Sequence, residues 1–158
     1  MPGQVLPAQS SATQAFAGLL RAHATATRRL NAQLVAEHDL TLSDYEVLLR
    51  LARVPDRRMR RVDLAEQVLL TASGITRLLD GLEAVGYVER GSCDADRRVV
   101  YAVLTDAGLE KLRAASASHV EQIDALFGER LDEAELSELA DLLLKLGQGD
   151  PGECEPAP

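Results

Sequence analysis

Apolar and polar residues alternate with a helical period over most of the chain. In residues 12–38 one face consists of positions three and four apart: Phe16, Leu20, His23, Thr27, Leu30 and Leu34. This spacing lines side chains up along one side of an α-helix. It predicts a long first helix in which two polar residues, His23 and Thr27, interrupt the buried stripe.

The next stretch, "TLSDYEVLLRLA", predicts a second helix in residues 41–52. Ser43 and Glu46 have the spacing of a capping box, in which each side chain bonds the backbone N–H of the other residue. We therefore expect the helix to begin near Asp44 and to end before Pro55. The arginine-rich "RVPDRRMRR" of residues 53–61 predicts a charged loop.

Two shorter helices are predicted in "VDLAEQVLLTASGITRLLDGLEAVGYVER". Asp63 can cap the first and Thr71 the second, with a brief turn between them, as in a helix-turn-helix. In the second helix the helical period turns one set of residues inward: Ile75, Leu78, Leu79 and Leu82. The outward set is then Ser73, Gly74, Thr76, Arg77 and Asp80. A small, polar first turn suits a helix that enters the major groove of DNA.

A β-hairpin is predicted directly after these helices. Gly86 predicts the end of the helix by its residue type. "YVER" and "VVYAVL" predict two strands, and "DADRR" predicts the turn between them. A hairpin in this position is the wing of a winged helix. Its tip carries Arg97 and Arg98, which could enter a DNA minor groove, with Asp94 or Asp96 orienting a guanidinium. The alternative is a solvated turn with incidental ion pairs.

The last third of the chain predicts two more helices. Thr105 can cap a helix that runs to about Phe127, and Asp132 with Glu135 form a variant capping box. The final helix carries an apolar stripe: Leu136, Leu139, Leu143 and Leu146. This stripe could pack on its own domain, but the terminal helices leave more apolar surface than one small domain covers. We therefore expect a homodimer.

Charge is distributed unevenly along the chain, whose formal net charge is −8. Residues 53–98 hold nine Arg and eight Asp or Glu, a balance of +1, whereas residues 105–158 hold four bases and thirteen acids, a balance of −9. The overall acidity therefore does not exclude a nucleic-acid contact in the middle segment, and Arg suits contacts to phosphate and guanine. The N-terminal segment lacks the features of a signal peptide and no apolar stretch reaches roughly 20 residues, so we expect a cytoplasmic protein without a membrane partner.

Residues 63–112, "DLAEQVLLTASGITRLLDGLEAVGYVERGSCDADRRVVYAVLTDAGLEKL", resemble the DNA-binding core of the MarR family of bacterial transcriptional regulators. The resemblance rests on the leucine-alanine helix, the small polar turn before "LEAVGYVER", the D-x-D-R-R wing and the "LT-x-x-G" that opens a long helix. It implies two sets of DNA contacts. The major-groove set is Thr71, Ser73, Gly74, Thr76 and Arg77, and the wing set is Asp96, Arg97 and Arg98. Many relatives carry Ser or Thr where this chain has Gly74.

The predicted fold is mainly α with a small β-hairpin wing: a winged helix-turn-helix flanked by N- and C-terminal dimerisation helices. The predicted boundaries are an N-terminal tail (1–11), a dimerisation helix (12–40), the DNA-binding domain (41–104), two dimerisation helices (105–147) and a C-terminal tail (148–158). No metal, cofactor or catalytic constellation is predicted, because the sequence contains no Gly-rich phosphate loop, HExxH or nucleophile elbow.

The resemblance also implies an effector crevice between the dimerisation helices and the winged helix. The residues that fit such a crevice are Arg21, His23, Thr27 and Tyr45, which favour a small anionic or aromatic effector. The alternative for His23 is a buried structural position in the core. Cys93, beside the wing, is either an oxidation sensor or a bystander, and Cys154 lies in the tail.

Taken together, the sequence predicts a regulator that binds double-stranded DNA at an inverted repeat as a homodimer and responds to an effector as a repressor. The alternative is a winged helix that binds a protein partner instead of DNA.

Overall fold

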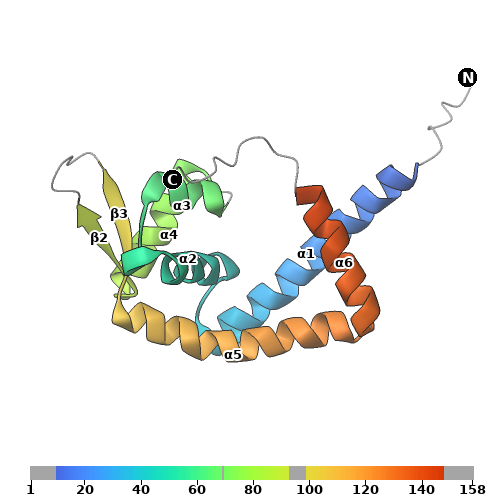
Figure 1. Ribbon diagram of the computed structural model, residues 1–158. Helices are drawn as coiled ribbons and strands as arrows, with labels where there is room; N and C mark the ends of the chain where they lie inside the picture. The colour runs from blue at the N-terminus through green and yellow to red at the C-terminus, as the bar shows by residue number, and fades with distance from the viewer. Residues whose placement is uncertain (1–9, 69, 93–98, 148–158) are drawn as a thin grey trace, which may run out of the picture. The chain divides into compact units, whose positions relative to one another are not determined.

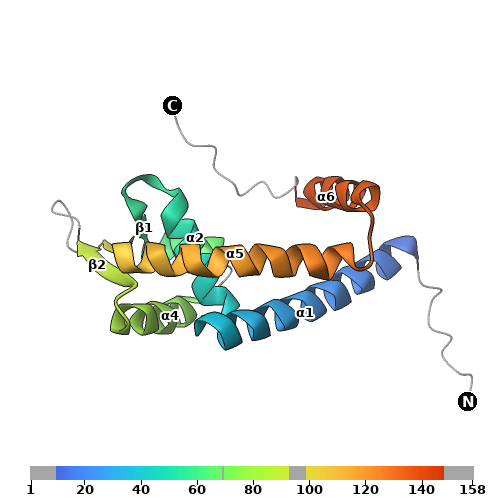
Figure 2. The same cartoon turned by 90° about the horizontal axis from the view of Figure 1, so that it is seen from below.

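A computed structural model of the protein describes residues 10–68, 70–92 and 99–147. The chain divides into two compact units, residues 1–119 and 120–158, hereafter unit 1 and unit 2. The elements of the described residues are shown in Figures 1 and 2: α1 (Ser11–His38), α2 (Leu42–Arg53), the 3₁₀ turn η1 (Pro55–Arg57), β1 (Arg58–Arg60), α3 (Arg61–Gln67), α4 (Ala72–Ala84), β2 (Val88–Ser92), β3 (Val100–Leu104), α5 (Asp106–Gly128) and α6 (Glu133–Gly147).

Unit 1 is built around a core to which α1 to α4, the strands and the first part of α5 all contribute. Leu34, Leu48, Leu51, Leu64 and Leu79 are completely buried in it. Burying a leucine side chain contributes roughly 1.5–3 kcal/mol, so this core stabilises the junction of the helix-turn-helix with α1 and α2. The fold class predicted from the sequence, mainly α with a small wing, is confirmed.

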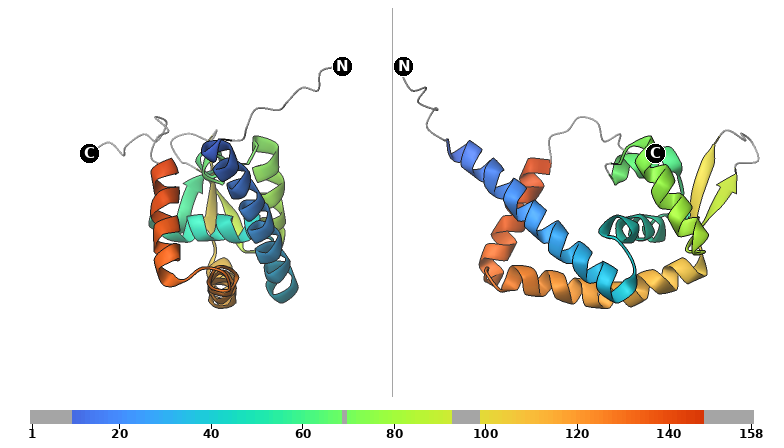
Figure 3. Two further views of the ribbon diagram at one scale, coloured as in Figure 1. Left: turned by 90° about the vertical axis from the view of Figure 1, so that its right-hand side faces the viewer. Right: turned by 180° about the vertical axis from the view of Figure 1, so that it is seen from behind.

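The sheet of unit 1 is antiparallel, three-stranded and ordered β1-β3-β2. In β2 and β3, Val88 pairs with Leu104 and Ser92 with Val100. The two strands run side by side in Figure 1 and in the right-hand view of Figure 3. The hairpin predicted from "YVER" and "VVYAVL" therefore exists, and its strands bring the two ends of the tip segment together.

The prediction of a charged loop across residues 53–61 is wrong. Arg58–Arg60 form strand β1, in which Met59 pairs with Ala102 and is buried while its two arginine neighbours are exposed. The R-M-R pattern is a strand of period two with one apolar residue inward. It was too short to distinguish from a loop, and its formation depends on the distant strand β3.

The start of α2 also differs from the prediction. The N-cap is Thr41, whose hydroxyl accepts the Asp44 N–H at 3.1 Å, while the Asp44 carboxylate accepts the Thr41 N–H at 2.9 Å. The predicted box of Ser43 and Glu46 is not the one used. Two candidate boxes overlap by two residues in "TLSDYE", and the earlier one, Thr41 with Asp44, starts the helix two residues sooner than the predicted box would.

The predicted ends of α4 and α5 agree with the structure. Thr71 caps α4 by accepting the Gly74 N–H at 3.1 Å, and Gly86 follows the helix with a φ of 79°, a conformation that favours glycine. The Thr105 hydroxyl accepts the Gly108 N–H at 3.0 Å and donates to the Gly86 carbonyl at 2.7 Å. A Cβ at position 108 would overlap the Tyr87 carbonyl oxygen, so only glycine allows α5 to start so close to β2.

The first helix, α1, has nearly the predicted bounds, but only its last turns are in the core. Leu30 and Leu34 are buried, whereas Phe16 and Leu20 are 62% and 52% exposed. His23, which the sequence placed on a buried stripe, is exposed, because the part of unit 1 that covers the helix reaches only its C-terminal portion. An apolar stripe in a sequence shows which face can be buried, not where along the helix a partner exists.

In unit 2, α6 begins at the predicted capping box. Asp132 accepts the Glu135 N–H and Glu135 accepts the Asp132 N–H, both at 2.9 Å. None of the residues of α6 is buried, and Leu142, Leu143, Leu144 and Leu146 are exposed. Among the described residues, no helix combines the length and the apolar character needed to span a bilayer.

Candidate nucleic-acid interface

The first turn of α4 presents small polar groups on an exposed surface. Thr71 and Ser73 are exposed, and their hydroxyls lie 3.2 Å apart. A Cβ on Gly74 would lie 3.2 Å from the Thr71 hydroxyl, tighter than an ordinary contact, so glycine leaves room for the cap. Glycine at position 74 therefore fits the close approach of the capping hydroxyl.

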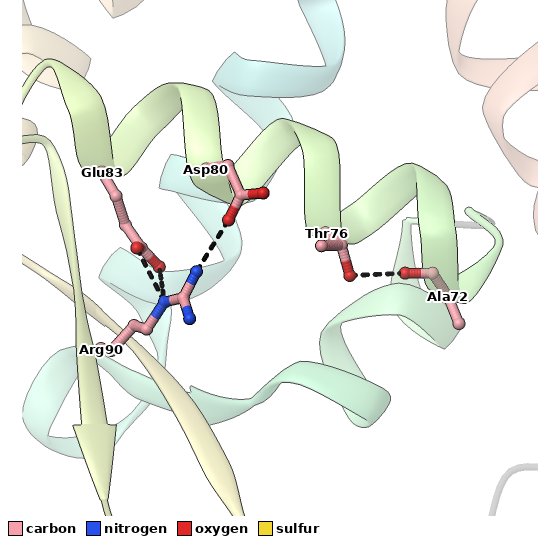
Figure 4. A network of polar contacts seen from close by, with 5 residues as sticks. All are labelled: Ala72, Thr76, Asp80, Glu83 and Arg90. Carbon is pink, nitrogen blue, oxygen red and sulfur yellow. Dashed lines mark hydrogen bonds and ion pairs between the residues drawn. The ribbon is translucent and has the colours of Figure 1, made fainter.

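The outward face of α4 is the one that the sequence predicted. Ile75, Leu79 and Leu82 are buried and Leu78 packs against the core, while Thr76, Arg77 and Asp80 are exposed. The Thr76 hydroxyl donates to the Ala72 carbonyl at 2.8 Å, as Figure 4 shows, so its proton is already used within the helix. Thr76 can then contribute only an acceptor and a methyl group to a ligand.

Arg77 lies on the outward face of α4 and makes no ion pair within the described residues. Its side chain is exposed one helical turn beyond the small polar turn of Ser73. An unpaired guanidinium offers its whole fork of donors to a base edge or a phosphate. The five predicted major-groove residues thus lie on one end and one side of a single helix.

Arg90 of β2 ties the second half of α4 to the sheet, an arrangement that the sequence analysis missed. Figure 4 shows its guanidinium between two acids: Nε lies 2.8 Å and 3.0 Å from the Glu83 carboxylate oxygens, and Nη2 lies 2.8 Å from Asp80 Oδ1. We call these three residues the Arg90 clamp. The hydrogen bond and charge of Glu83, with a further contribution from Asp80, raise the pKa of Arg90.

The clamp has two consequences for the interface. Its single positive charge offsets one of the two negative charges on the helix that carries the candidate DNA contacts, and it connects α4 to a strand of the wing. Asp80 is therefore engaged rather than free, although the sequence placed it correctly on the outward face. Spacing within α4 could not reveal the partner, because Arg90 is seven and ten residues away on another element.

The wing residues predicted as contacts, Asp96, Arg97 and Arg98, lie outside the described residues, as do Asp94, Cys93 and Cys154. The structure describes the strands up to Ser92 and from Val100. Of these strands, β2 contacts α4.

The predicted effector residues are not gathered in one pocket. Arg21 and His23 are exposed, Thr27 is half-buried with its hydroxyl donating to the His23 carbonyl at 2.7 Å, and Tyr45 is buried in the core. The two surface cavities described for unit 1, each of about 410 Å³, have other residues in their walls.

Tyr45 instead belongs to a group of buried and half-buried polar residues, which we call the junction cluster: His38, Tyr45, Ser116, Ser118 and His119. The Tyr45 and His119 rings lie 4.5 Å apart between centroids. Ser116 donates to the Leu112 carbonyl at 2.7 Å, so the Tyr45 hydroxyl is the donor in its 3.2 Å bond to Ser116. His38 Nε2 shares a 2.7 Å hydrogen bond with Ser118.

The buried histidine of this protein is therefore His119, not His23. It is 4% exposed, and its Nδ1 has no hydrogen-bond partner among the described residues. Burial lowers the pKa of His119, and the nearby His38 lowers it further. The cluster ties α5 to the end of α1 and the start of α2, and only the three-dimensional arrangement brings these five residues together.

Within the described ranges, no three His, Cys, Asp or Glu side chains are placed to hold a metal ion. The features of the site are instead a capped, polar helix start, an unpaired arginine beside it and a hairpin clamped to the same helix. Together they define a winged helix-turn-helix protein.

Comparison with known proteins identifies the group to which it belongs. The MarR family profile matches residues 38–99. The structure is similar to that of AbsC, a MarR family transcriptional regulator from Streptomyces coelicolor, with 30% identity, a TM-score of 0.78 and coverage of 90% of this chain and 96% of AbsC. It is also similar to Sco3205 from the same organism, a MarR family regulator solved in complex with DNA, with 27% identity, a TM-score of 0.81 and 96% coverage of both chains.

A third relative is the HTH-type transcriptional repressor YetL of Bacillus subtilis, which is 31% identical over 98 residues, or 62% of this chain and 59% of YetL. The protein belongs to the MarR family of transcriptional regulators. Its class is that of regulators and not of enzymes.

Proposed function

We propose that the protein is a repressor that binds an inverted-repeat operator as a homodimer. The observation that carries the proposal is the start of α4: a Thr71-capped turn of small polar residues, exposed, with unpaired Arg77 on the same side. Recognition helices read base edges with their N-terminal residues, and an arginine gives bidentate contacts to guanine. Thr71, Ser73, Gly74, Thr76 and Arg77 are the proposed major-groove residues.

The proposed partner of α4 is the wing. Arg97 and Arg98, with Asp96 to orient a guanidinium, would contact the minor groove, where negative potential is concentrated. The Arg90 clamp supports this division of labour, because it holds the strand that leads to the tip against the helix that would lie in the neighbouring groove.

Dimerisation through α1, α5 and α6 is the second part of the proposal. In unit 1, α1 exposes Phe16, Leu19 and Leu20, and in unit 2, α6 exposes four leucines. Exposed apolar residues in such numbers mark a surface that another chain covers. Two recognition helices held one turn of DNA apart, about 34–36 Å, would read the two halves of an inverted repeat.

Control of the repressor by a small anionic or aromatic effector is the third part. Arg21, His23 and Thr27 lie on α1, which is exposed over these turns, so a dimer partner would be needed to complete a pocket there. Tyr45 is buried, so its contribution would be to the pocket wall. Benzoate is a suitable probe: it should raise the thermal unfolding midpoint of the wild type more than that of His23→Ala, and equal shifts would contradict these residues as the site.

The experiment that tests DNA binding is recovery and sequencing of genomic fragments bound by the purified protein. Three variants are compared with the wild type: Arg77→Ala, the double variant Arg97→Ala/Arg98→Ala, and Arg113→Ala as a control. Arg113 is an exposed arginine on α5 that makes no ion pair within the described residues. In Figure 1, α5 lies on the other side of α2 from α3.

We expect the wild type and Arg113→Ala to enrich one inverted repeat. Arg77→Ala should relax the preference at one position of each half-site, at a cost of about 1–3 kcal/mol, and the wing double variant should weaken binding to all sequences. A folded wild type that enriches no sequence at low salt would contradict the proposal and favour a winged helix that binds a protein partner. An enriched site without internal symmetry would contradict the recognition of an inverted repeat by a dimer, but not sequence-specific DNA binding.

A further inference from the structure

The segment 53–61, which the sequence presented as a charged loop, contains five arginines. Arg53 ends α2, and the structure divides the other four into two pairs. Arg57 Nη1 lies 2.8 Å from Asp106 Oδ1, and the Arg58 guanidinium lies 4.1 Å from the centre of the Tyr101 ring. These two side chains connect η1 and β1 to α5 and β3. They are occupied by contacts within unit 1.

The second pair, Arg60 and Arg61, lines a surface cavity of about 410 Å³. The other walls are Val62 from α3, Val100 at the start of β3 and Val99 just before it. Val62 is 58% exposed and Val100 37% exposed, so the cavity is open to a ligand as large as a macromolecule. We call this cavity the Arg60–Arg61 pocket.

The pocket has more positive than negative charge. Arg60 Nε lies 3.3 Å from Asp63 Oδ2, which orients its guanidinium. Arg61 has no carboxylate partner, and its Nη2 is buried without a hydrogen-bond acceptor among the described residues. Two guanidinium groups against one carboxylate leave a net charge of about +1 beside apolar walls, where a charge is screened less than in water.

A pocket with this charge is complementary to an anion. A phosphodiester group carries a single negative charge and accepts hydrogen bonds from arginine, so its charge matches the excess in the pocket. The position of the pocket indicates the source, because its walls come from the start of α3, the first helix of the helix-turn-helix, and from β3, a strand of the wing. First helices of this motif cross the DNA backbone while the second helix enters the groove.

We propose that the Arg60–Arg61 pocket binds a backbone phosphate of DNA between the major-groove contacts of α4 and the minor-groove contacts of the wing. This inference rests on the proposed function and extends it to residues that neither the recognition helix nor the wing tip contains. A phosphate contact positions the protein on the duplex without reading sequence. Arg60 and Arg61 are thus positioning residues for the complex.

The test uses the full chain and a fluorescently labelled duplex of random sequence, with affinity followed by anisotropy as salt is raised. The variants are Arg60→Gln/Arg61→Gln and, as the matched control, Arg113→Gln. Each phosphate contact contributes about 0.9 to the slope of log affinity against log salt. Loss of one phosphate contact in the double variant should therefore lower the slope by about one. The loss of affinity should be the same for every DNA sequence. The control should keep the wild-type slope.

A second variant protects the test against a failure to fold. Val62→Glu adds a carboxylate to the pocket at an exposed position in the first turn of α3, where an acidic residue is favourable for the helix. It should offset the excess charge and reduce the slope in the same way. Circular dichroism confirms that each variant is folded before its binding is measured.

The outcomes separate this inference from the proposed function. Salt-dependent binding by the wild type, with unchanged slopes in both pocket variants, would overturn the phosphate site and leave DNA binding intact. A wild type without salt-dependent binding would overturn both. Inorganic phosphate that stabilises the wild type against heat more than the double variant, together with unchanged DNA slopes, would assign the pocket to a free anion and overturn the DNA contact.

Discussion

Helices α4 and α5 each bury an apolar stripe in unit 1, but they place their polar residues in opposite surroundings. On α4 the polar residues are exposed: Thr76 bonds its own helix, Arg77 is unpaired, and Asp80 meets Arg90 at the surface. On the part of α5 in unit 1, Ser116, Ser118 and His119 face the packed junction with α1 and α2.

The difference separates two uses of polar side chains. In the junction cluster, His38, Tyr45, Ser116 and Ser118 are hydrogen-bonded within the protein. Leaving a buried donor or acceptor unpaired costs about 1–3 kcal/mol, so these bonds help to specify how α5 packs. The polar side chains of α4 are exposed. An ion pair at the surface contributes little to stability, and exposed polar groups remain available to a ligand. Substitutions in the junction cluster on α5 should therefore change mainly the free energy of unfolding. Substitutions of the exposed polar residues on α4 should change mainly the affinity for DNA.

The largest effect that this comparison predicts is on two glycines, one in each helix. Gly108→Ala should lower the free energy of unfolding by about 3 kcal/mol, the upper part of the usual range for overpacking, because the new Cβ would overlap the Tyr87 carbonyl oxygen and lie 2.7 Å from Leu104 Cδ1. Gly81→Ala is the matched control, since nothing lies within 4 Å of its Cβ position. It should raise stability by about 0.5–1 kcal/mol, as expected for alanine in a helix. Urea unfolding measures both, and equal effects would contradict the difference in packing.

The next effect is the pH dependence of the junction. His119 has a folded-state pKa below its ordinary value of 6.5, so below that pH the unfolded chain binds more protons than the folded one. Its contribution to stability is complete above about pH 6.5 and is lost as the pH falls through the lower, folded-state pKa. Unfolding curves across this window should show a smaller loss for His119→Leu than for the wild type. Parallel curves would show that His119 does not titrate in the predicted direction.

A smaller effect is expected from the Tyr45 hydroxyl. Tyr45→Phe keeps the ring beside His119 but removes the donor to Ser116, and it should lower the free energy of unfolding by about 1 kcal/mol. Ser116→Ala tests the other partner. If the two residues interact, the double variant should cost less than the sum of the single ones in a urea-denaturation cycle. Strict additivity would argue against the bond.

The smallest effect on stability should follow from opening the Arg90 clamp. Arg90→Gln removes exposed ion pairs to Asp80 and Glu83, so its unfolding midpoint should shift less than that of Tyr45→Phe, and the shift should disappear at high salt. The same variant should weaken DNA binding, because α4 and the wing would no longer be held together. A large, salt-independent loss of stability would place the clamp with the junction cluster instead.

Sequence patterns alone were sufficient for the elements whose signals are local. Thr71, Gly86, Thr105 and the Asp132–Glu135 box mark helix ends within a few residues of their partners, and the inward face of α4 follows from its period. The overlap of two possible boxes in "TLSDYE" shows the limit of such signals. Both have a spacing compatible with a cap, and the structure uses Thr41 and Asp44.

Other features depend on residues far apart in the chain. β1 exists because Met59 pairs with Ala102, the Arg90 clamp crosses from a strand to a helix, and the junction cluster joins residues about 70 to 80 positions apart. The sequence by itself determined where the helices, the hairpin and the outward face of α4 are, because the repeat of apolar residues and the caps act within one element. Only the tertiary structure decided which histidine is buried, which arginines are paired and which line an open pocket, because burial and charge pairing arise from packing between elements.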